Sequence, residues 1–152
     1  MGLDITLTNR RTHEEVYWRK ANMVFGYFVK KAGDEDKAYE NDFTFKDVKE
    51  LLDKCKMLKK ELKLVPGKVV VGMHGEETKD GGWEWVSDYE DGYLIENKEL
   101  AEKELPLVDG FFFGIREYSN FYMNYIDETI EKLGNLLAGS KETDKFIFYA
   151  SY

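Results

Sequence analysis

The chain has little of the chemistry that usually marks an enzyme or a metalloprotein. Its 152 residues include one cysteine, Cys55, and two histidines, His13 and His74. A single thiol excludes a disulfide framework and a thiolate cluster, and no His-x-x-x-His or Glu-x-x-His pair is present to bind zinc. Cys55 falls on an apolar helical stripe, where a small core residue is expected. His74, between glycines, is a candidate general base, although no partner nucleophile is evident.

Motifs that bind phosphates or activate a serine are also missing. There is no Gly-x-x-x-x-Gly-Lys-Ser/Thr loop, no Gly-x-Gly-x-x-Gly after a strand and no Gly-x-Ser-x-Gly elbow. The sequence therefore indicates no catalytic residue, no cofactor and no metal, and it favours a non-enzymatic protein. No apolar run approaches the roughly 20 residues that span a bilayer, and the first residues lack the features of a signal peptide. We expect an intracellular protein that does not engage a membrane.

What the chain does have is an uneven distribution of charge. The formal net charge is −8, yet residues 76–109 alone contain twelve acids and three lysines, a local charge of −9. Such a field repels nucleic acid and attracts a basic protein surface. A solvated acidic surface that only keeps the protein soluble is the competing interpretation. The predicted partner-binding residues are Glu76, Glu77, Asp80, Glu84, Asp88, Glu90 and Asp91.

Aromatic residues are also abundant, at 15% of the chain. Two segments, 17–28 and 111–122, combine them with basic side chains. Arginine can bind a phosphate in a bidentate manner, and an aromatic ring can stack on a base. An alternative function is therefore a nucleotide or small-ligand site, or an enzyme built on such a site. In the competing interpretation the rings are core and the cations pair with carboxylates such as Glu15. The candidate ligand residues are Trp18, Arg19, Lys20, Asn22 and Arg116.

The length and the apolar content of 43% predict one domain over residues 1–152. Alternating Leu3, Ile5 and Leu7 predict a first strand. Thr12 and Glu15 have the spacing of a capping box, which predicts a helix over about 13–31. Its expected inner face is Tyr17, Ala21, Val24, Phe25 and Phe28.

Further helices are predicted after three other capping residues, Thr44, Asn97 and Ser119. Strands are predicted near 68–72 and 83–86, with turns at 80–82 and at 91–92. The final strand, 146–150, is expected to pair with the first. The predicted fold is α+β: three main helices packed on a small antiparallel sheet that pairs the N- and C-terminal strands, with a middle β-hairpin excursion.

Several segments resemble a family of small, largely uncharacterised bacteriophage and prophage proteins. That family has a Met-Gly-Leu-Asp start, a Tyr-Trp-Arg-Lys-x-Asn helix, a Gly-Phe-Phe-Phe-Gly segment, a Tyr-rich helix and an aromatic C-terminal strand. Departures are Phe25, where the family has His, and Ile115 and Arg116, where it has small polar or acidic residues. The corresponding segments here are 1–4, 17–22, 110–114, 118–125 and 146–152.

The resemblance implies a protein of a mobile element that acts in the host cytoplasm, and it implies no activity. Together with the acidic segment, it predicts a non-enzymatic phage or prophage protein that interferes with a host protein, as an anti-defence inhibitor would. The partner would be a host protein with a basic surface. A homodimer that covers exposed aromatic residues is a further hypothesis.

Overall fold

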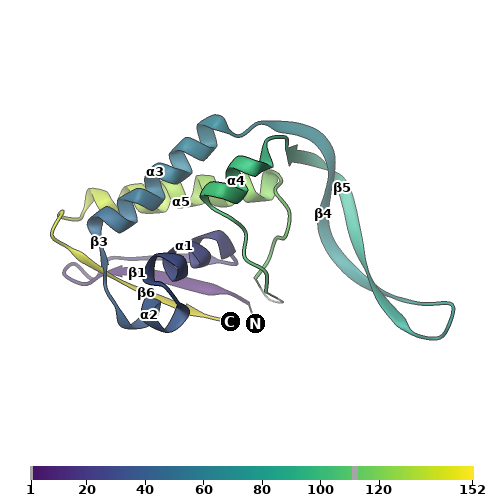
Figure 1. Cartoon of the computed structure of the whole chain (residues 1–152), viewed down its shortest axis with the longest axis horizontal. Helices are drawn as coiled ribbons and strands as arrows, with labels where there is room; N and C mark the ends of the chain where they lie inside the picture. The colour runs from purple at the N-terminus through teal and green to yellow at the C-terminus, as the bar shows by residue number, and fades with distance from the viewer. Residues whose placement is uncertain (1, 111–112) are drawn as a thin grey trace.

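The computed structural model describes residues 2–110 and 113–152, and it shows a body from which a long two-stranded arm projects (Figure 1). The predicted α+β class is confirmed, with helices and antiparallel strands alternating along the chain. The elements are β1 (Asp4–Asn9), β2 (Glu15–Arg19), α1 (Asn22–Ala32), α2 (Glu35–Glu40), β3 (Phe43–Thr44), α3 (Phe45–Glu61), β4 (Leu64–Glu77), β5 (Trp83–Ile95), α4 (Lys98–Glu104), α5 (Asn120–Ala138) and β6 (Lys145–Ser151).

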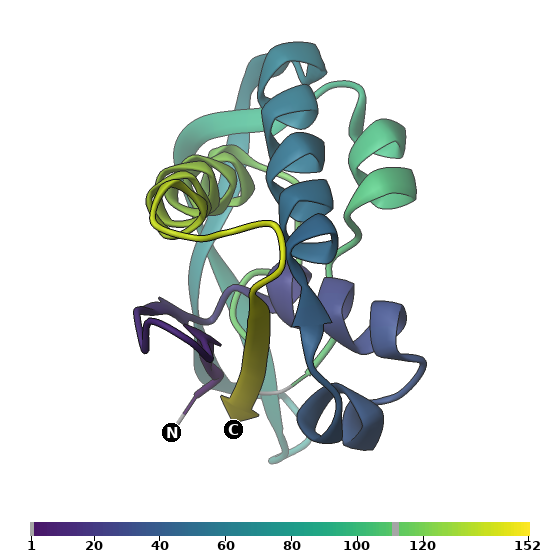
Figure 2. The same ribbon diagram turned by 90° about the vertical axis from the view of Figure 1, so that its left-hand side faces the viewer.

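The sheet of the body has the strand order β2-β1-β6-β3. The predicted pairing of the first and last strands is confirmed, because β1 and β6 are antiparallel neighbours from Asp4↔Ser151 to Asn9↔Phe146. Alternate residues of these strands are buried, as expected of a sheet with one covered face. Helices α3 and α5 cross above that sheet (Figure 2). The core lies between these layers.

The helix predicted over 13–31 is wrong in its first half. Residues 15–19 form strand β2, which pairs with β1 so that Trp18 lies opposite Ile5. His13 and Lys20 have φ values of 64° and 59°, left-handed conformations that a right-handed helix cannot contain. Helix α1 begins only at Asn22. Tyr17, predicted to face inward, is 45% exposed.

The capping box expected at the start of that helix is absent because Thr12 lies in the turn between β1 and β2 and Glu15 begins strand β2. The hydroxyl of Thr12 accepts a hydrogen bond from the N–H of Glu14. The side-chain oxygen of Asn9 accepts from the N–H groups of Arg11 and Thr12. A Thr-x-x-Glu spacing fits either structure, and here the burial of alternate residues in β2 decides for the strand.

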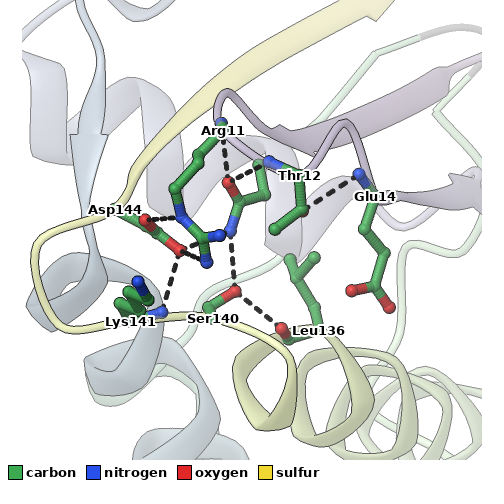
Figure 3. A network of polar contacts seen from close by, with 8 residues as sticks. Arg11, Thr12, Glu14, Leu136, Ser140, Lys141 and Asp144 are labelled. Carbon is green, nitrogen blue, oxygen red and sulfur yellow. Dashed lines mark hydrogen bonds and ion pairs between the residues drawn. The ribbon is translucent and has the colours of Figure 1, made fainter.

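The β1–β2 turn is tied to the segment before β6 by a polar network (Figure 3). Asp144, 5% exposed, accepts hydrogen bonds from the Arg11 guanidinium at 2.7 and 2.9 Å and from the Asn9 amide at 2.9 Å. The N–H of Lys141 adds a third donor at 2.8 Å. The bond to Arg11 contributes most to holding the pKa of the Asp144 carboxyl well below its usual range. The two ends of the chain are therefore joined by side chains as well as by the sheet.

The remaining helices form where they were predicted, but the cap expected from Asn97 is wrong: its side chain accepts from the N–H of Lys63 and donates to the carbonyl of Glu61 instead. Thr44 and Asp47 form the capping box of α3, and Ser119 caps α5 by accepting from the N–H of Phe121. The middle region is a hairpin, but the turn predicted at Asp91-Gly92 is wrong. Both residues lie within β5, and the hairpin turns at residues 78–82. Of the predicted apolar segment 111–113, the first two residues lie outside the described part of the chain.

Candidate functional site

The β4–β5 arm is the feature that separates this protein from a plain α+β domain. Its strands pair continuously from Leu64↔Ile95 to Glu77↔Trp83, with one bulge at Val71. Strand β4 has 14 residues, so the arm is on the order of 45 Å long. Figure 1 shows it leaving the body beyond α3 and α4 and curving away from the other elements.

Among the described residues, the hydrogen bonds that anchor the arm to the body lie at its base. The N–H of Ile95 donates to the carbonyl of Tyr118 at 3.0 Å, and the N–H of Tyr93 donates to the side chain of Asn120 at 3.1 Å. The N–H of Val70 donates to the Glu117 carboxylate at 2.7 Å. The segment 117–120 that starts α5 thus holds the arm. Beyond this point, residues 71–88 include no buried side chain.

Glycine explains how the base comes so close to the body. A Cβ on Gly92 would lie 2.7 Å from Val69 and 3.0 Å from the side chain of Asn120. A side chain there would displace the side chains of Val69 and Asn120, and the latter binds β5 to the start of α5. The glycine predicted to make a turn therefore permits close packing instead.

The two faces of the arm differ in chemistry. Residues paired across an antiparallel ladder point to the same side, and side chains alternate along each strand. By this register one side, the aromatic face, presents Trp83, Trp85, Tyr89, Tyr93 and Met73. Their exposed fractions are 75%, 70%, 61%, 51% and 54%, respectively. Such a row of large exposed apolar side chains usually marks a surface that contacts another molecule.

The opposite side, the acidic face, presents Glu76, Glu84, Asp88 and Glu90 in the same register. His74 lies among them, with its ring nitrogens 2.7 Å from Glu76 and 2.6 Å from Asp88. These two hydrogen bonds raise the pKa of the His74 imidazole. Because Glu76 is on the same strand as His74, a protonated His74 would join β4 to β5 through Asp88 alone.

All seven acidic residues predicted to bind a partner lie on the arm. Besides the four on the acidic face, Glu77 and Asp91 belong to the aromatic face and Asp80 to the turn. Asp91 pairs with Lys68 on the neighbouring strand. The arm from residue 64 to residue 95 carries seven carboxylates against two lysines, a formal charge of −5.

Two of the predicted ligand residues are part of the core. Trp18 has no exposed surface, and its indole N–H donates to the Thr129 hydroxyl at 3.1 Å. Asn22 is also fully buried, and its amide donates to the carbonyls of Phe113 and Ile115 at 3.0 and 2.9 Å. Asn22 thereby fixes the segment that follows residue 112, and neither side chain can contact a ligand in this arrangement.

The other three predicted ligand residues do not form one site. Arg19 and Lys20 line a hollow of about 460 Å³ between β2 and the start of α5, together with Tyr17, Tyr125 and Lys132. Arg116 is exposed but does not line this hollow. The structure thus brings Arg19 and Lys20 together with two tyrosines and with Lys132, which forms an ion pair with Glu128 in the same hollow.

The side chains considered for catalysis offer no assembled site. Burial raises the pKa of the Cys55 thiol to about 12, which keeps it protonated and unreactive. His74 lies between two carboxylates on the exposed arm. Within residues 2–110 and 113–152, no three His, Cys, Asp or Glu side chains are arranged to hold a metal ion. In the same residues, no helix combines the length and apolarity needed to cross a bilayer.

Sequence reasoning missed the aromatic face. Trp83 and Trp85 were predicted to alternate in a strand, which is correct, but their exposure was not predicted. The available signal was the pattern Trp-Glu-Trp followed by further aromatic residues at even spacing, which places all the rings on one side of a strand. Whether that side meets a core or solvent depends on the neighbours of the strand, and within the described residues β4 is the one strand that pairs with β5.

In comparisons with known proteins, no family model matched the chain, and neither a curated protein nor a solved structure was found to be similar to it. The resemblance to phage proteins therefore stays a prediction.

Proposed function

We propose that this chain is a non-enzymatic binding protein whose β4–β5 arm docks on the basic surface of another protein. The observation that carries the proposal is the arm itself: a strand pair with a charge of −5 whose outer half has no buried side chain. With the resemblance to phage proteins, the partner would be a host protein. By binding, the chain would interfere with that protein and so act as an anti-defence inhibitor.

The projection of the arm strengthens its electrostatic action. At physiological ionic strength the field of a charge falls off within about 8 Å, so charges held on the body act only close to it. Beyond Val70, which is still bonded to the body, residues 71–77 of β4 extend on the order of 23 Å and carry the outer carboxylates up to about three such lengths away from the body. A basic groove can therefore meet these charges without contact between the two bodies, which raises the rate of association.

A pair of matched variants tests the proposal. In the arm variant, Glu77, Glu84 and Glu90 become Gln. In the body variant, Glu102, Glu131 and Glu142 become Gln. All six side chains are exposed, and none forms an ion pair within the described residues. Both variants change the net charge from −8 to −5, so any difference between them arises from the position of the charge.

The measurement is capture of host proteins from a bacterial lysate by the immobilised chain, with identification by mass spectrometry and elution by salt. We expect a basic protein that is retained by the parent chain and by the body variant, and lost from the arm variant at lower salt. Equal retention by the two variants, or retention that does not respond to salt, would contradict the proposal.

The hollow beside β2 supports a second candidate function, the binding of a small anionic ligand. Arg19 and Lys20 supply positive charge there, whereas Lys132 is paired with Glu128, which also lines the hollow, at 2.6 Å. Tyr17 and Tyr125 supply rings that can stack on a base. A thermal-shift screen with nucleotides and cyclic dinucleotides tests it. A ligand at 100 times its Kd stabilises the folded state by about 2.7 kcal/mol. A flat response of the melting temperature across the panel would remove this candidate.

A further inference from the structure

We propose that Trp83, Gly75 and Trp85 form a slot on the aromatic face that binds the guanidinium group of an arginine presented by the partner protein. This inference rests on the proposed function and specifies the chemistry that the arm recognises.

The slot follows from the register of the two strands. Trp83 and Trp85 are two residues apart on one face of β5, so their Cβ atoms are separated by about 6.6 Å. A planar group between two rings needs about 7 Å, twice the usual contact distance between carbon atoms. Both indoles are exposed, so they are free to rotate and hold a guanidinium between them.

Gly75 lets the Trp83 indole lie against β4. It lies directly opposite Trp85 and diagonal to Trp83 on the same face. A Cβ at this position would already be 3.4 Å from Cε3 of the Trp83 ring. A larger side chain would displace the Trp83 indole, so the position of this wall of the slot depends on glycine at residue 75.

A carboxylate stands beside the rings. Glu77 is the direct partner of Trp83 on the aromatic face, and it forms no ion pair within the described residues. It can accept two hydrogen bonds from a guanidinium that stacks on the neighbouring indole. The cations that lie over rings in the described chain are on the body, where Lys132 approaches Tyr17 and Trp18. The described residues thus place no cation of this chain over Trp83 or Trp85.

The charge of the arm selects the occupant. Exposed indoles could also stack on nucleic-acid bases or sugars, but a formal charge of −5 on the arm repels a phosphate backbone. A neutral sugar would not be attracted by that charge. An arginine uses both features, because its planar cation stacks on a ring and pairs with a carboxylate. A lysine ammonium gains the charge but cannot fill a flat slot.

Binding of synthetic peptides to the full chain tests the proposal. The probes are octa-arginine and octa-lysine, which carry equal charge, and the readouts are tryptophan fluorescence and calorimetry. Trp18 is fully buried and provides a constant background, so a fluorescence change reports on Trp83 and Trp85. We expect octa-arginine to bind about tenfold more tightly than octa-lysine and to change the fluorescence.

Gly75→Val and Gly72→Val form a matched pair. Both substitutions add the same side chain to β4, but Gly72 lies on the acidic face, where a Cβ would meet only Asp88 at 3.7 Å. Gly75→Val should weaken octa-arginine binding about tenfold and remove the preference over octa-lysine, whereas Gly72→Val should change affinity less than about twofold. Trp85→Leu should act as Gly75→Val does.

The outcomes separate this inference from the proposed function. If both peptides bind equally and neither Gly75→Val nor Trp85→Leu changes the affinity, the guanidinium slot is refuted. The proposed function survives that result as long as Glu77→Gln and Glu84→Gln weaken binding equally and salt weakens it further. A larger effect of Glu77→Gln than of Glu84→Gln supports the slot, since only Glu77 lies on the aromatic face.

Discussion

Removal of the outer arm should leave the body folded. The perturbation replaces Val71–Asp88 with a short turn built around Asn-Gly, so that the hairpin closes just beyond Val70↔Tyr89. The substitution keeps the buried Val69 and the hydrogen bonds of Val70 and Tyr93 to the start of α5. It deletes five carboxylates, one lysine and both exposed tryptophans.

The expected change in the free energy of unfolding follows from the burial of the deleted residues. Residues 71–88 include no buried side chain, so their removal costs the body no core contact. Changes at surfaces of this kind alter the free energy of unfolding by about 0.5 kcal/mol or less. For a chain of this size, 1 kcal/mol corresponds to about 2–4 °C in the melting temperature. We therefore expect a shift of about 1–2 °C.

The assay is thermal unfolding of both proteins, followed by circular dichroism and calorimetry over a range of protein concentrations. A decrease of more than about 5 °C would refute the reasoning. It would mean that the aromatic face is covered, as in a homodimer, and that the arm contributes to the stability of an assembly. In that case the melting temperature of the intact chain would also rise with concentration.

Three further predictions concern stability and protonation. Trp18→Ala should lower the free energy of unfolding, measured by urea titration, by about 3–5 kcal/mol, because it empties a fully buried site. As the control, Arg19→Ala should change this free energy by less than about 0.5 kcal/mol. Equal effects of the two substitutions would show that Trp18 is not a core residue. The depressed pKa of Asp144 means that its contribution is present above the unfolded pKa of about 3.9 and is lost as the pH falls through the folded pKa. Asp144→Asn should therefore be less stable than the parent at pH 7 and lose less stability on acidification, and urea midpoints that fall in parallel would contradict this. The pKa of His74 is raised, so its contribution depends on pH in the opposite direction: it is complete below pH 6.5 and is lost as the pH rises through the folded pKa. An NMR titration should show the ring losing its proton above pH 6.5 in the parent and nearer pH 6.5 in a Glu76→Gln/Asp88→Asn variant. Identical titrations of the two proteins would exclude the contacts of His74 with these carboxylates.

The local signals in the sequence predicted much of the fold. Thr44 with Asp47 and Ser119 before α5 mark helix starts whose side chains form the expected capping bonds. The alternation in β1 and the apolar residues of β6 predicted strands that do pair. These signals work because a cap or an alternating strand is decided within a few residues.

The errors arose where two structures compete for the same local pattern. Thr12 and Glu15 fit a capping box, but Trp18 gains a fully buried position opposite Ile5 only if residues 15–19 are extended. Gly92 fits a hairpin turn, but the contact between β5 and Asn120 requires a glycine within the strand. Both choices are made by residues distant in the sequence, which no local pattern contains.

For the candidate site, the acidic residues could be predicted from the sequence, whereas the aromatic face could not, because it depends on residues distant in the sequence. The seven acidic residues of the arm are visible as a charge cluster in the sequence, and the structure adds that they lie on a projecting hairpin. The partition of the arm into an acidic face and an aromatic face depends on the register of β4 against β5. That register includes the bulge at Val71, which shifts the outer part of β4 by one residue, and a bulge leaves no clear mark in the sequence.

The most direct test of the account compares the intact chain with the arm-truncated chain in capture of a partner from a bacterial lysate at increasing salt. The account predicts a basic protein that the intact chain retains at low salt and releases as salt rises, and that the truncated chain, though folded, does not retain. Retention of the same protein by both chains with the same salt dependence would contradict it.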